Sequence, residues 1–278
     1  MSGREGKRIL IVGCGKMGEA ILAGWLQAGA VAAADVVVVQ PTEERRAYVH
    51  DRYRVACVSA LDWLVGSFDM VLLGVKPQVM PSVLAELRDM PLFAEVQEKP
   101  VFVSIAAGLS TKRLEEMLGF EAPVVRVMPN VALQVGCGAS AVCAGTYACD
   151  AQLQQVRDLF ALLGDAVVLG ENLMDASCAL NGSGPAYVAR MIECLRDAAV
   201  EEGLDAALAE RLALQTVYGT AALMKERAQS ARETKLSVCS PGGTTLAALD
   251  AMEKAGFEAS LHAGVAAAVA RSKELAQC

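Results

Sequence analysis

The sequence predicts an α/β protein in which a sheet domain precedes an all-α domain. Up to about residue 170, short β-branched runs alternate with helical patterns, which is typical of βαβ units and of a parallel sheet covered on both faces. Beyond residue 170 strand-like runs nearly vanish, and long patterns rich in Ala and Leu follow. We therefore expect two domains, residues 1–170 and residues 171–278.

The composition is that of a folded protein without a nucleic-acid-binding or membrane-spanning surface. The chain has 278 residues, of which 54% are hydrophobic and 21% charged, so it can bury a large core. A net charge of −7 and the lack of any Lys/Arg run argue against nucleic acid as a partner. No apolar run reaches the roughly 18 residues that cross a bilayer. We expect a soluble, cytoplasmic protein.

The cysteine and histidine pattern does not suggest a metal site. There are nine cysteines without regular spacing and two histidines, and no C-x-x-C occurs. A zinc centre is therefore not expected. Buried, reduced thiols of a cytosolic protein are the expected role of the cysteines.

The individual elements follow from hydrophobic periodicity. Residues 136–145 carry more turn residues and predict an edge strand, with an antiparallel arrangement open. The stretch "AGVAAAVAR" (263–271) has little polar face, which predicts a helix buried in a core or in a subunit interface; a monomer that buries it internally is the alternative. The predicted strands are 7–12, 35–40, 69–75, 100–106, 123–128, 136–145 and 165–170, and the predicted helices include 16–29, 186–203, 205–228 and 257–276.

A dinucleotide-binding turn is predicted between the first strand and the first helix. The segment Gly13-Cys14-Gly15-Lys16-Met17-Gly18 matches G-x-G-x-x-G. In a Rossmann-type domain Gly13 permits the tight turn, Gly15 lets backbone approach the pyrophosphate, and Gly18 lets helix and strand pack closely. The phosphates then face the positive end of the helix. A plain β–turn–α connection is the alternative.

The end of the second strand indicates which nucleotide is bound. An acid normally stands there when the cofactor is NAD, because its carboxylate binds the ribose 2′-hydroxyl. Here the residues are Gln40, Pro41 and Thr42, and Arg45 and Arg46 follow a turn later. We therefore expect NADPH, with NADH possible, although two glutamates precede the arginines in the same turn.

Two further segments are candidate walls of the cofactor site. Val75-Lys76-Pro77-Gln78 and Met128-Pro129-Asn130 each follow a predicted strand, so both should lie at the carboxyl edge of the sheet, where ligands bind. Proline there offers a flat apolar surface for a nicotinamide, and Asn130 could bind its carboxamide. Taken singly, each segment could equally be a loop.

Two glycine-interrupted helix starts mark the second half of the chain. Asn181–Pro185 opens one helix, and Pro185 suits its first turn. "SPGGTT" (240–245) opens a later one. Together with the earlier motifs, these make the whole chain resemble the pyrroline-5-carboxylate reductases. The motifs are "GCGKMGEAILAG", "VKPQ", "SIAAG", "VVRVMPN", "NGSGPAY", "EEGL", "TVYGTAALM", "SPGGTTLAAL" and "AAAVARSKEL".

The resemblance implies a reaction, an assembly and a set of site residues. The reaction is reduction of 1-pyrroline-5-carboxylate to L-proline by hydride transfer from NADPH. The helical domain would interleave with that of a partner in a homodimer, which in this family often assembles into a decamer, and the substrate would bind at that interface. The cofactor-binding residues implied are Gly13, Cys14, Gly15, Lys16, Met17, Gly18, Gln40, Thr42, Arg45, Val75, Lys76, Pro77, Ala107, Pro129 and Asn130. The substrate-binding residues implied are Ser240, Gly242, Gly243, Thr244 and Thr245, with the Thr245 hydroxyl catalytic beside the imine nitrogen.

Five positions depart from the usual family pattern. "MPNTP" becomes "MPNVA" (128–132), "SGSGP" becomes "NGSGP" with Asn181, and "TSPGG" becomes "CSPGG" with Cys239. Ser59 stands where an asparagine is often found near the adenosine ribose. These departures concern the affinity for the cofactor more than the reaction.

The residues agree with imine reduction. A protonated cyclic imine is already electrophilic, so the protein needs no strong general acid, which suits a chain with two histidines outside the motifs. The glycines of "SPGGTT" leave N–H groups accessible at a helix start, and its hydroxyls add donors for a carboxylate. A plain capped turn is the alternative for this segment.

Two other functions remain open at this stage. Another imine reductase or a β-hydroxyacid dehydrogenase of similar build would place a catalytic Lys or Asp on the first long helix of the second domain; residues 186–203 offer Arg190, Glu193, Arg196 and Asp197 but no Lys. A non-enzymatic nicotinamide-dependent sensor would bind the cofactor without turnover.

Overall fold

The computed structural model describes residues 7–275. It contains two compact units: residues up to Ser183 together with those from Ala268 onward, and Gly184–Ala267. The predicted boundary near Gly170 lies before this division, because residues 171–183 pack with the sheet. The outer domain limits at residues 1 and 278, a helix end at residue 276 and Cys278 lie outside the described residues.

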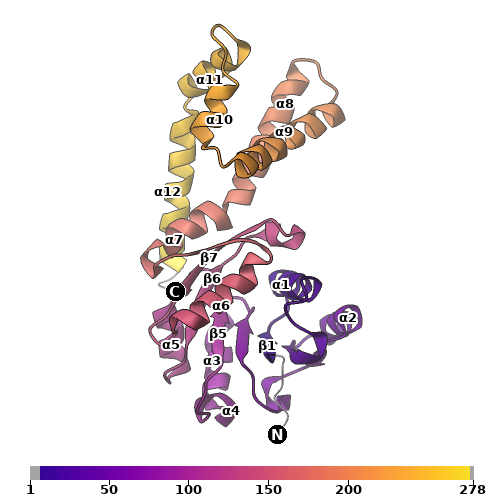
Figure 1. Cartoon of the computed structure of the whole chain (residues 1–278), viewed down its shortest axis with the longest axis vertical. Helices are drawn as coiled ribbons and strands as arrows, with labels where there is room; N and C mark the ends of the chain where they lie inside the picture. Colours follow the sequence, from indigo (N-terminus) through magenta and orange to yellow (C-terminus); the bar gives the residue numbers. More distant parts are fainter. Residues whose placement is uncertain (1–6, 276–278) are drawn as a thin grey trace. The chain divides into compact units, whose positions relative to one another are not determined.

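The first unit is built on an eight-stranded sheet in the order β3-β2-β1-β4-β5-β6-β7-β8 (Figure 1). All neighbouring strands are parallel except β6 and β7, which are antiparallel. The strands are β1 Ile9–Val12, β2 Val36–Val39, β3 Ala56–Val58, β4 Met70–Leu73, β5 Val101–Ser104, β6 Val124–Met128, β7 Gly138–Ala144 and β8 Gly164–Val168. This arrangement confirms the predicted parallel α/β domain.

One sequence-based expectation about the sheet is wrong. Residues 136–145 do form a strand antiparallel to its neighbour, but β7 lies inside the sheet rather than at its edge. The reason is that helix α6 (Asp150–Ala161) returns the chain, so that β8 pairs parallel on the outer side of β7. Within the described residues, the two edge strands are β3 and β8.

Both faces of the sheet are buried, as continuous apolar strands require. Ile9 and Ile11 point into one core, whereas Leu10 and Val12 point into the other. The first core is closed by α1 (Lys16–Gln27), α2 (Glu43–Tyr53) and α6. The second core is closed by α3 (Met80–Asp89), α4 (Pro91–Ala94) and α5 (Thr111–Leu118).

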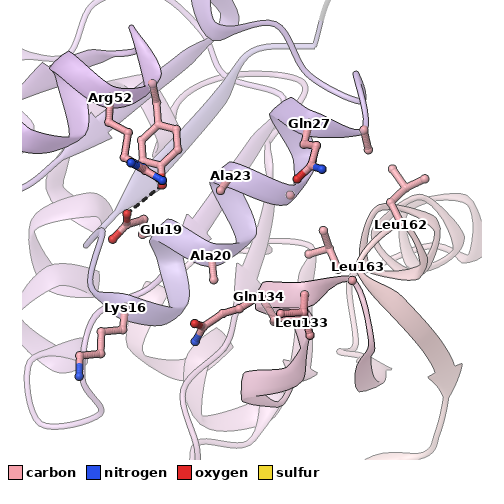
Figure 2. Close-up of a pocket in the computed structure, with 15 residues that line it drawn as sticks. Lys16, Glu19, Ala20, Ala23, Gln27, Arg52, Leu133, Gln134, Leu162 and Leu163 are labelled. Carbon is pink, nitrogen blue, oxygen red and sulfur yellow. Dashed lines mark hydrogen bonds between the residues drawn. The ribbon is translucent and has the colours of Figure 1, made fainter. Parts of the chain in front are cut away.

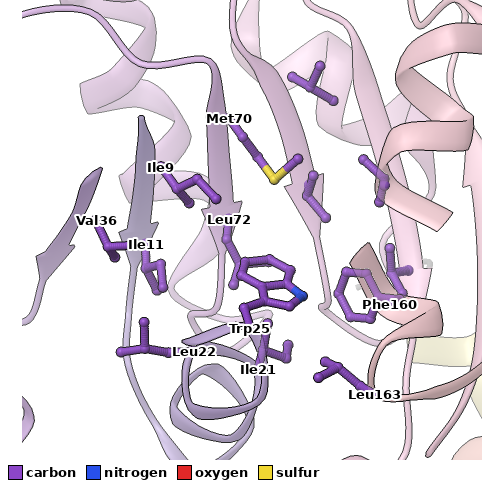
Figure 3. Close-up of a cluster of buried hydrophobic side chains, with 14 of the residues drawn as sticks. Ile9, Ile11, Ile21, Leu22, Trp25, Val36, Met70, Leu72, Phe160 and Leu163 are labelled. Carbon is purple, nitrogen blue, oxygen red and sulfur yellow. The ribbon is translucent and has the colours of Figure 1, made fainter. Parts of the chain in front are cut away.

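Trp25 anchors α1 in the first core, where it lies against Phe160 of α6 (Figure 3). Both rings are buried, with centroids 5.8 Å apart in an edge-to-face arrangement. The indole Nε1 donates to the carbonyl of Leu159 at 3.0 Å, so the one polar atom of this side chain is satisfied. The contact fixes α1, and with it the turn that precedes the helix.

Short helical turns complete the first unit and connect it to the second. Residues 171–183 form one continuous run that packs beside β7 and β6. Its last part is a π-turn, in which the Ser183 N–H donates to the carbonyl of Cys178 at 3.0 Å. This run consists of η4 Glu171–Leu173, α7 Met174–Ser177 and η5 Cys178–Gly182. The other short turns of the unit are η1 Ala33–Asp35, η2 Leu61–Trp63 and η3 Val131–Val135.

The second unit is all helical, as predicted. Its helices are α8 Gly184–Glu201, α9 Ala206–Arg227, α10 Ala231–Ser237, α11 Thr244–Lys254 and the first part of α12 Phe257–Leu275. Asp205 caps α9 by accepting from the N–H groups of Ala207 and Leu208, and Ser230 with Glu233 forms a capping box on α10. None of residues 263–271 is buried in the single chain, so the single chain does not bury this stripe internally.

None of the helices within residues 7–275 is long and apolar enough to cross a membrane. The same described residues contain no group of three or more His, Cys, Asp or Glu side chains placed to hold a metal ion.

Candidate active site

The glycine turn lies where the strand order of the sheet reverses direction. The chain leaves β1 for β2 on one side, and β4 lies on the other side of β1. The Gly13 N–H donates to the carbonyl of Val39 at 2.9 Å, and the Gly74 N–H donates to that of Val12 at 2.8 Å. In open α/β sheets such a switch point forms the crevice in which nucleotides bind.

Each glycine of the motif has the environment that a dinucleotide site requires. Gly13 has φ +86°, a left-handed conformation that side chains rarely adopt. A Cβ on Gly18 would lie 2.8 Å from the Gly13 oxygen, whereas one on Gly15 would meet no heavy atom within 4 Å. Gly18 is thus needed for packing, whereas Gly15 faces open space.

The start of α1 is free to bind an anion. The helix begins at Lys16, and its N-cap residue, Gly15, offers no side-chain cap to the first-turn N–H groups. These donors and the helix dipole favour negative charge at this end. Cys14 is buried within the turn, and burial raises the pKa of its thiol to about 12. It is therefore a neutral packing group at physiological pH.

Gln40 stands directly after β2, where an NAD-binding protein carries its acid. Its Oε1 accepts from the Cys14 N–H at 3.1 Å, so the side chain holds the glycine turn and leaves its own amide N–H groups as donors. Because the side chain is neutral, it does not repel a 2′-phosphate as a carboxylate would. Pro41 and Thr42 next to it are exposed.

Glu19 and Arg45 form an ion pair beside the glycine turn. Glu19 also accepts from the hydroxyls of Tyr48 at 2.9 Å and Tyr53 at 2.8 Å. Burial alone would raise the pKa of Glu19, but the hydrogen bonds from Arg45 and the two tyrosines lower it below its usual value. The carboxylate therefore stays charged and keeps Arg45 in place.

In the predicted nicotinamide walls, one side-chain acceptor is already hydrogen-bonded within the chain. Asn130 uses its Oδ1 to accept from the N–H groups of Ala132 at 3.2 Å and Ala139 at 3.1 Å, so only its amide N–H groups remain for a ligand. Pro129 is buried beside it. The other wall is closer to the turn, because Val75 Cγ1 occupies the space where Gly13 would carry a Cβ. Lys76 is exposed, and Pro77 and Ala107 are half-buried.

A groove of about 730 Å³ runs along the outer side of α1 (Figure 2). Its polar side chains include Lys16, Glu19, Arg52 and Gln134, and its apolar floor includes Leu163. Lys16 is the one predicted cofactor residue among its lining residues. The groove therefore borders the glycine turn without coinciding with the predicted nicotinamide walls.

The predicted substrate residues all lie in one turn of the helical unit. The Gly243 N–H donates to the Ser240 carbonyl at 3.0 Å, and Gly242 has φ +71°, the pattern of a type II turn with Pro241 before the glycine. A Cβ on Gly243 would overlap the Ser240 hydroxyl. Helix α11 then starts at Thr244 without a side-chain cap, so its first N–H groups and the half-buried Thr245 are available to a carboxylate.

Two side chains that organise the site were not among the predicted site residues. Glu19 holds Arg45, and Asn181 donates to the carbonyls of Met128 and Ala139, both at 2.8 Å. Asn181 was noted as a departure from the family motif, but its partners are far away in sequence. Glu19 carries no motif signal beyond its place in the first turn of α1.

The fold and the glycine turn at Gly13–Gly18 define a Rossmann-type dinucleotide-binding protein. Consistent with that class, residues 8–108 match the family described as NADP oxidoreductase, coenzyme F420-dependent. Residues 171–275 match the family described as pyrroline-5-carboxylate reductase dimerisation. A pyrroline-5-carboxylate reductase from Synechocystis is 41% identical over 266 residues, which cover 95% of this chain and 97% of that protein. The chain belongs to the pyrroline-5-carboxylate reductase family, which confirms the resemblance inferred from the motifs.

Solved structures agree with this assignment. A Plasmodium falciparum pyrroline carboxylate reductase with NADP bound is 31% identical, with a TM-score of 0.84 over 99% of this chain and 100% of that one. A pyrroline-5-carboxylate reductase from Coxiella burnetii is 29% identical, with a TM-score of 0.90 over 98% of this chain and 99% of that one. The predicted two-part fold is therefore confirmed along the whole chain.

Proposed function

We propose that this protein reduces 1-pyrroline-5-carboxylate to L-proline with NADPH as the hydride donor, the final step of proline biosynthesis. The observation that carries the proposal is the glycine turn at the switch point, with open space over Gly15, in a chain that belongs to this reductase family. NADPH is favoured over NADH because Gln40 replaces the acid after β2 and two arginines follow.

The cofactor would be held by the turn and by the strand ends around it. The N–H groups at Gly15, Lys16 and Met17 would bind the pyrophosphate, and the free amide of Gln40 would bind the adenosine ribose. The segments at Val75–Pro77, Ala107 and Pro129–Asn130 would shield the nicotinamide from water. The bound dihydronicotinamide supplies the hydride; the protein supplies position and exclusion of solvent.

The substrate carboxylate would bind at the start of α11. Its partners would be the first N–H groups of that helix, together with the hydroxyls of Ser240 and Thr244. The Thr245 hydroxyl would lie beside the protonated ring nitrogen and donate to the lone pair that forms on it as the hydride adds to the neighbouring carbon. The proposed substrate and cofactor residues lie in different compact units.

A homodimer is the assembly that this site would require, and a decamer of such dimers is possible. Support comes from the match to a dimerisation family over residues 171–275 and from the uncovered small-residue stripe of α12. We further propose a cytoplasmic location, reduced thiols, and no nucleic-acid or membrane partner, since the net charge is −7 and the chain has no Lys/Arg run.

The test is to mix the protein with NADPH and 1-pyrroline-5-carboxylate and to follow both NADPH absorbance and proline by mass spectrometry. Proline formed in step with NADPH loss is the expected result. NADPH binding without turnover would instead indicate a sensor, and turnover only with a 3-hydroxy acid and NADP⁺ would indicate a dehydrogenase.

On α8, Arg190 pairs with Glu193 and Arg196 with Asp197, so none of these groups is a free acid or base in the single chain.

A further inference from the structure

We propose that Arg46 binds the 2′-phosphate of NADPH, whereas Arg45 positions the glycine turn through Glu19 and does not bind that phosphate. The inference rests on the proposed function, which requires NADPH but does not distinguish the two arginines. Both occupy the first turns of α2 and are adjacent in sequence, yet the structure directs them to different parts of the nucleotide site.

Arg45 is directed toward the pyrophosphate turn. Its Nε donates to the carbonyl of Cys14 at 2.8 Å and its Nη2 to that of Gly15 at 3.4 Å. Its positive charge is neutralised by Glu19, and the guanidinium carbon lies 5.0 Å from the centre of the Tyr48 ring. Because the Arg45–Glu19 pair is neutral overall, it attracts a phosphate only weakly. Arg45 instead fixes two carbonyls of the glycine turn.

Arg46 is directed toward the strand end at which the adenosine ribose binds. Its Nη1 donates to the carbonyl of Gln40 at 2.9 Å and also to that of Pro41. Gln40 is the position whose side chain contacts the ribose 2′ group in dinucleotide-binding domains. The guanidinium therefore already lies at the backbone that a 2′-phosphate would approach.

The charge of Arg46 is not cancelled by the protein. Among residues 7–275, no carboxylate lies within ion-pair distance of this side chain, and its Nε and Nη2 groups make no hydrogen bond to a described residue. Glu43 and Glu44 in the same turn are exposed and are turned to solvent rather than paired with it. An unpaired guanidinium with three spare N–H donors on two nitrogens is suited to a phosphate dianion.

The assignment can be tested by binding alone, without the reaction. Adenosine 2′,5′-bisphosphate and 5′-AMP would be titrated calorimetrically into the full-length wild type and into R45A, R46A and R46K. R46A should lose about tenfold or more in affinity for the bisphosphate, because a charge-assisted hydrogen bond is lost, and should bind 5′-AMP as the wild type does. R46K should retain part of the preference, since it keeps the charge.

R45A is the matched control, because it removes the same side chain one residue away. It should weaken both nucleotides by similar factors, since the glycine turn serves both. A selective loss of the bisphosphate in R45A, or unchanged affinities in R46A, would overturn the assignment. Circular dichroism and thermal unfolding of each variant would report whether it is folded.

Failure of this inference and failure of the proposed function give different results. If Arg46 discriminates the two nucleotides but the wild type oxidises no NADPH with 1-pyrroline-5-carboxylate, the function is wrong and the phosphate site stands. If the imine is reduced and R46A keeps full discrimination, the function stands and the assignment to Arg46 is wrong.

Discussion

Asn130 and Asn181 hydrogen-bond to the two sides of one residue, Ala139. The Asn130 Oδ1 accepts from its N–H at 3.1 Å, and the Asn181 Nδ2 donates to its carbonyl at 2.8 Å. Asn181 also donates to the carbonyl of Met128, the first residue of the predicted nicotinamide wall, at 2.8 Å. The start of β7 therefore links that wall to the π-turn that leads out of the sheet domain.

Asn181→Ala should destabilise the sheet domain. It leaves two carbonyls without their donor, which costs about 1–3 kcal/mol in the free energy of unfolding when such groups are shielded from water. Ser177→Ala is the control, because it removes only the hydroxyl that donates to Asn181 Oδ1 at 2.7 Å. Chemical denaturation would measure both. Equal stability of the wild type and the Asn181 variant would contradict this role.

Gly15→Ala and Gly74→Ala should separate cofactor binding from folding. A Cβ at position 15 meets no heavy atom within 4 Å, so this variant should unfold like the wild type yet bind NADPH at least about tenfold more weakly, because the methyl group occupies the path of the pyrophosphate. A Cβ at position 74 would overlap the Gly13 oxygen and should lower stability. Thermal unfolding and NADPH fluorescence titration would measure the two effects, and a destabilised Gly15→Ala variant would count against the open site.

Thr245→Ala should lower kcat with 1-pyrroline-5-carboxylate by about tenfold or more, since a hydrogen bond that strengthens in the transition state contributes on this scale. The affinity for NADPH should not change, because the proposed partner of Thr245 is the imine nitrogen and not the nucleotide. Thr220→Ala is the control: its hydroxyl already donates to the carbonyl of Thr216 at 2.7 Å. Steady-state kinetics with an unchanged kcat would remove Thr245 from the mechanism.

Cys14 should resist alkylation although it lies in the cofactor motif. Its thiol is buried and has a pKa of about 12, and only the thiolate reacts, so reactivity at neutral pH should be negligible and should rise as pH approaches that value. Cys137 and Cys149 are exposed and should react first. Iodoacetamide labelling followed by peptide mass spectrometry would rank them. Early labelling of Cys14 in the folded protein would show that the turn is open to solvent.

Much of the fold followed from local pattern. The strands that end at Val12, Val39 and Leu73 were predicted within a few residues, because a strand covered on both faces must be continuously apolar. The glycine turn was predicted for a similar reason: Gly13 allows a left-handed backbone conformation, and Gly18 allows close packing against the preceding turn. The "SPGGTT" turn also depends on neighbours in sequence; residues 240–243 form a turn before α11, and its carboxylate site stays a prediction.

What the sequence by itself determined is therefore the strands other than β3, the longest helices, the two-part organisation and the reductase family. Tertiary structure alone decided that β7 lies inside the sheet and that the Asn130 Oδ1 accepts from backbone N–H groups. It also decided that Arg45 and Arg46 bind different carbonyls. The physical reason is that these outcomes depend on partners distant in sequence. Glu19 and the carbonyl of Cys14 attract Arg45, whereas the carbonyl of Gln40 attracts Arg46, and no local periodicity records which partner each side chain meets.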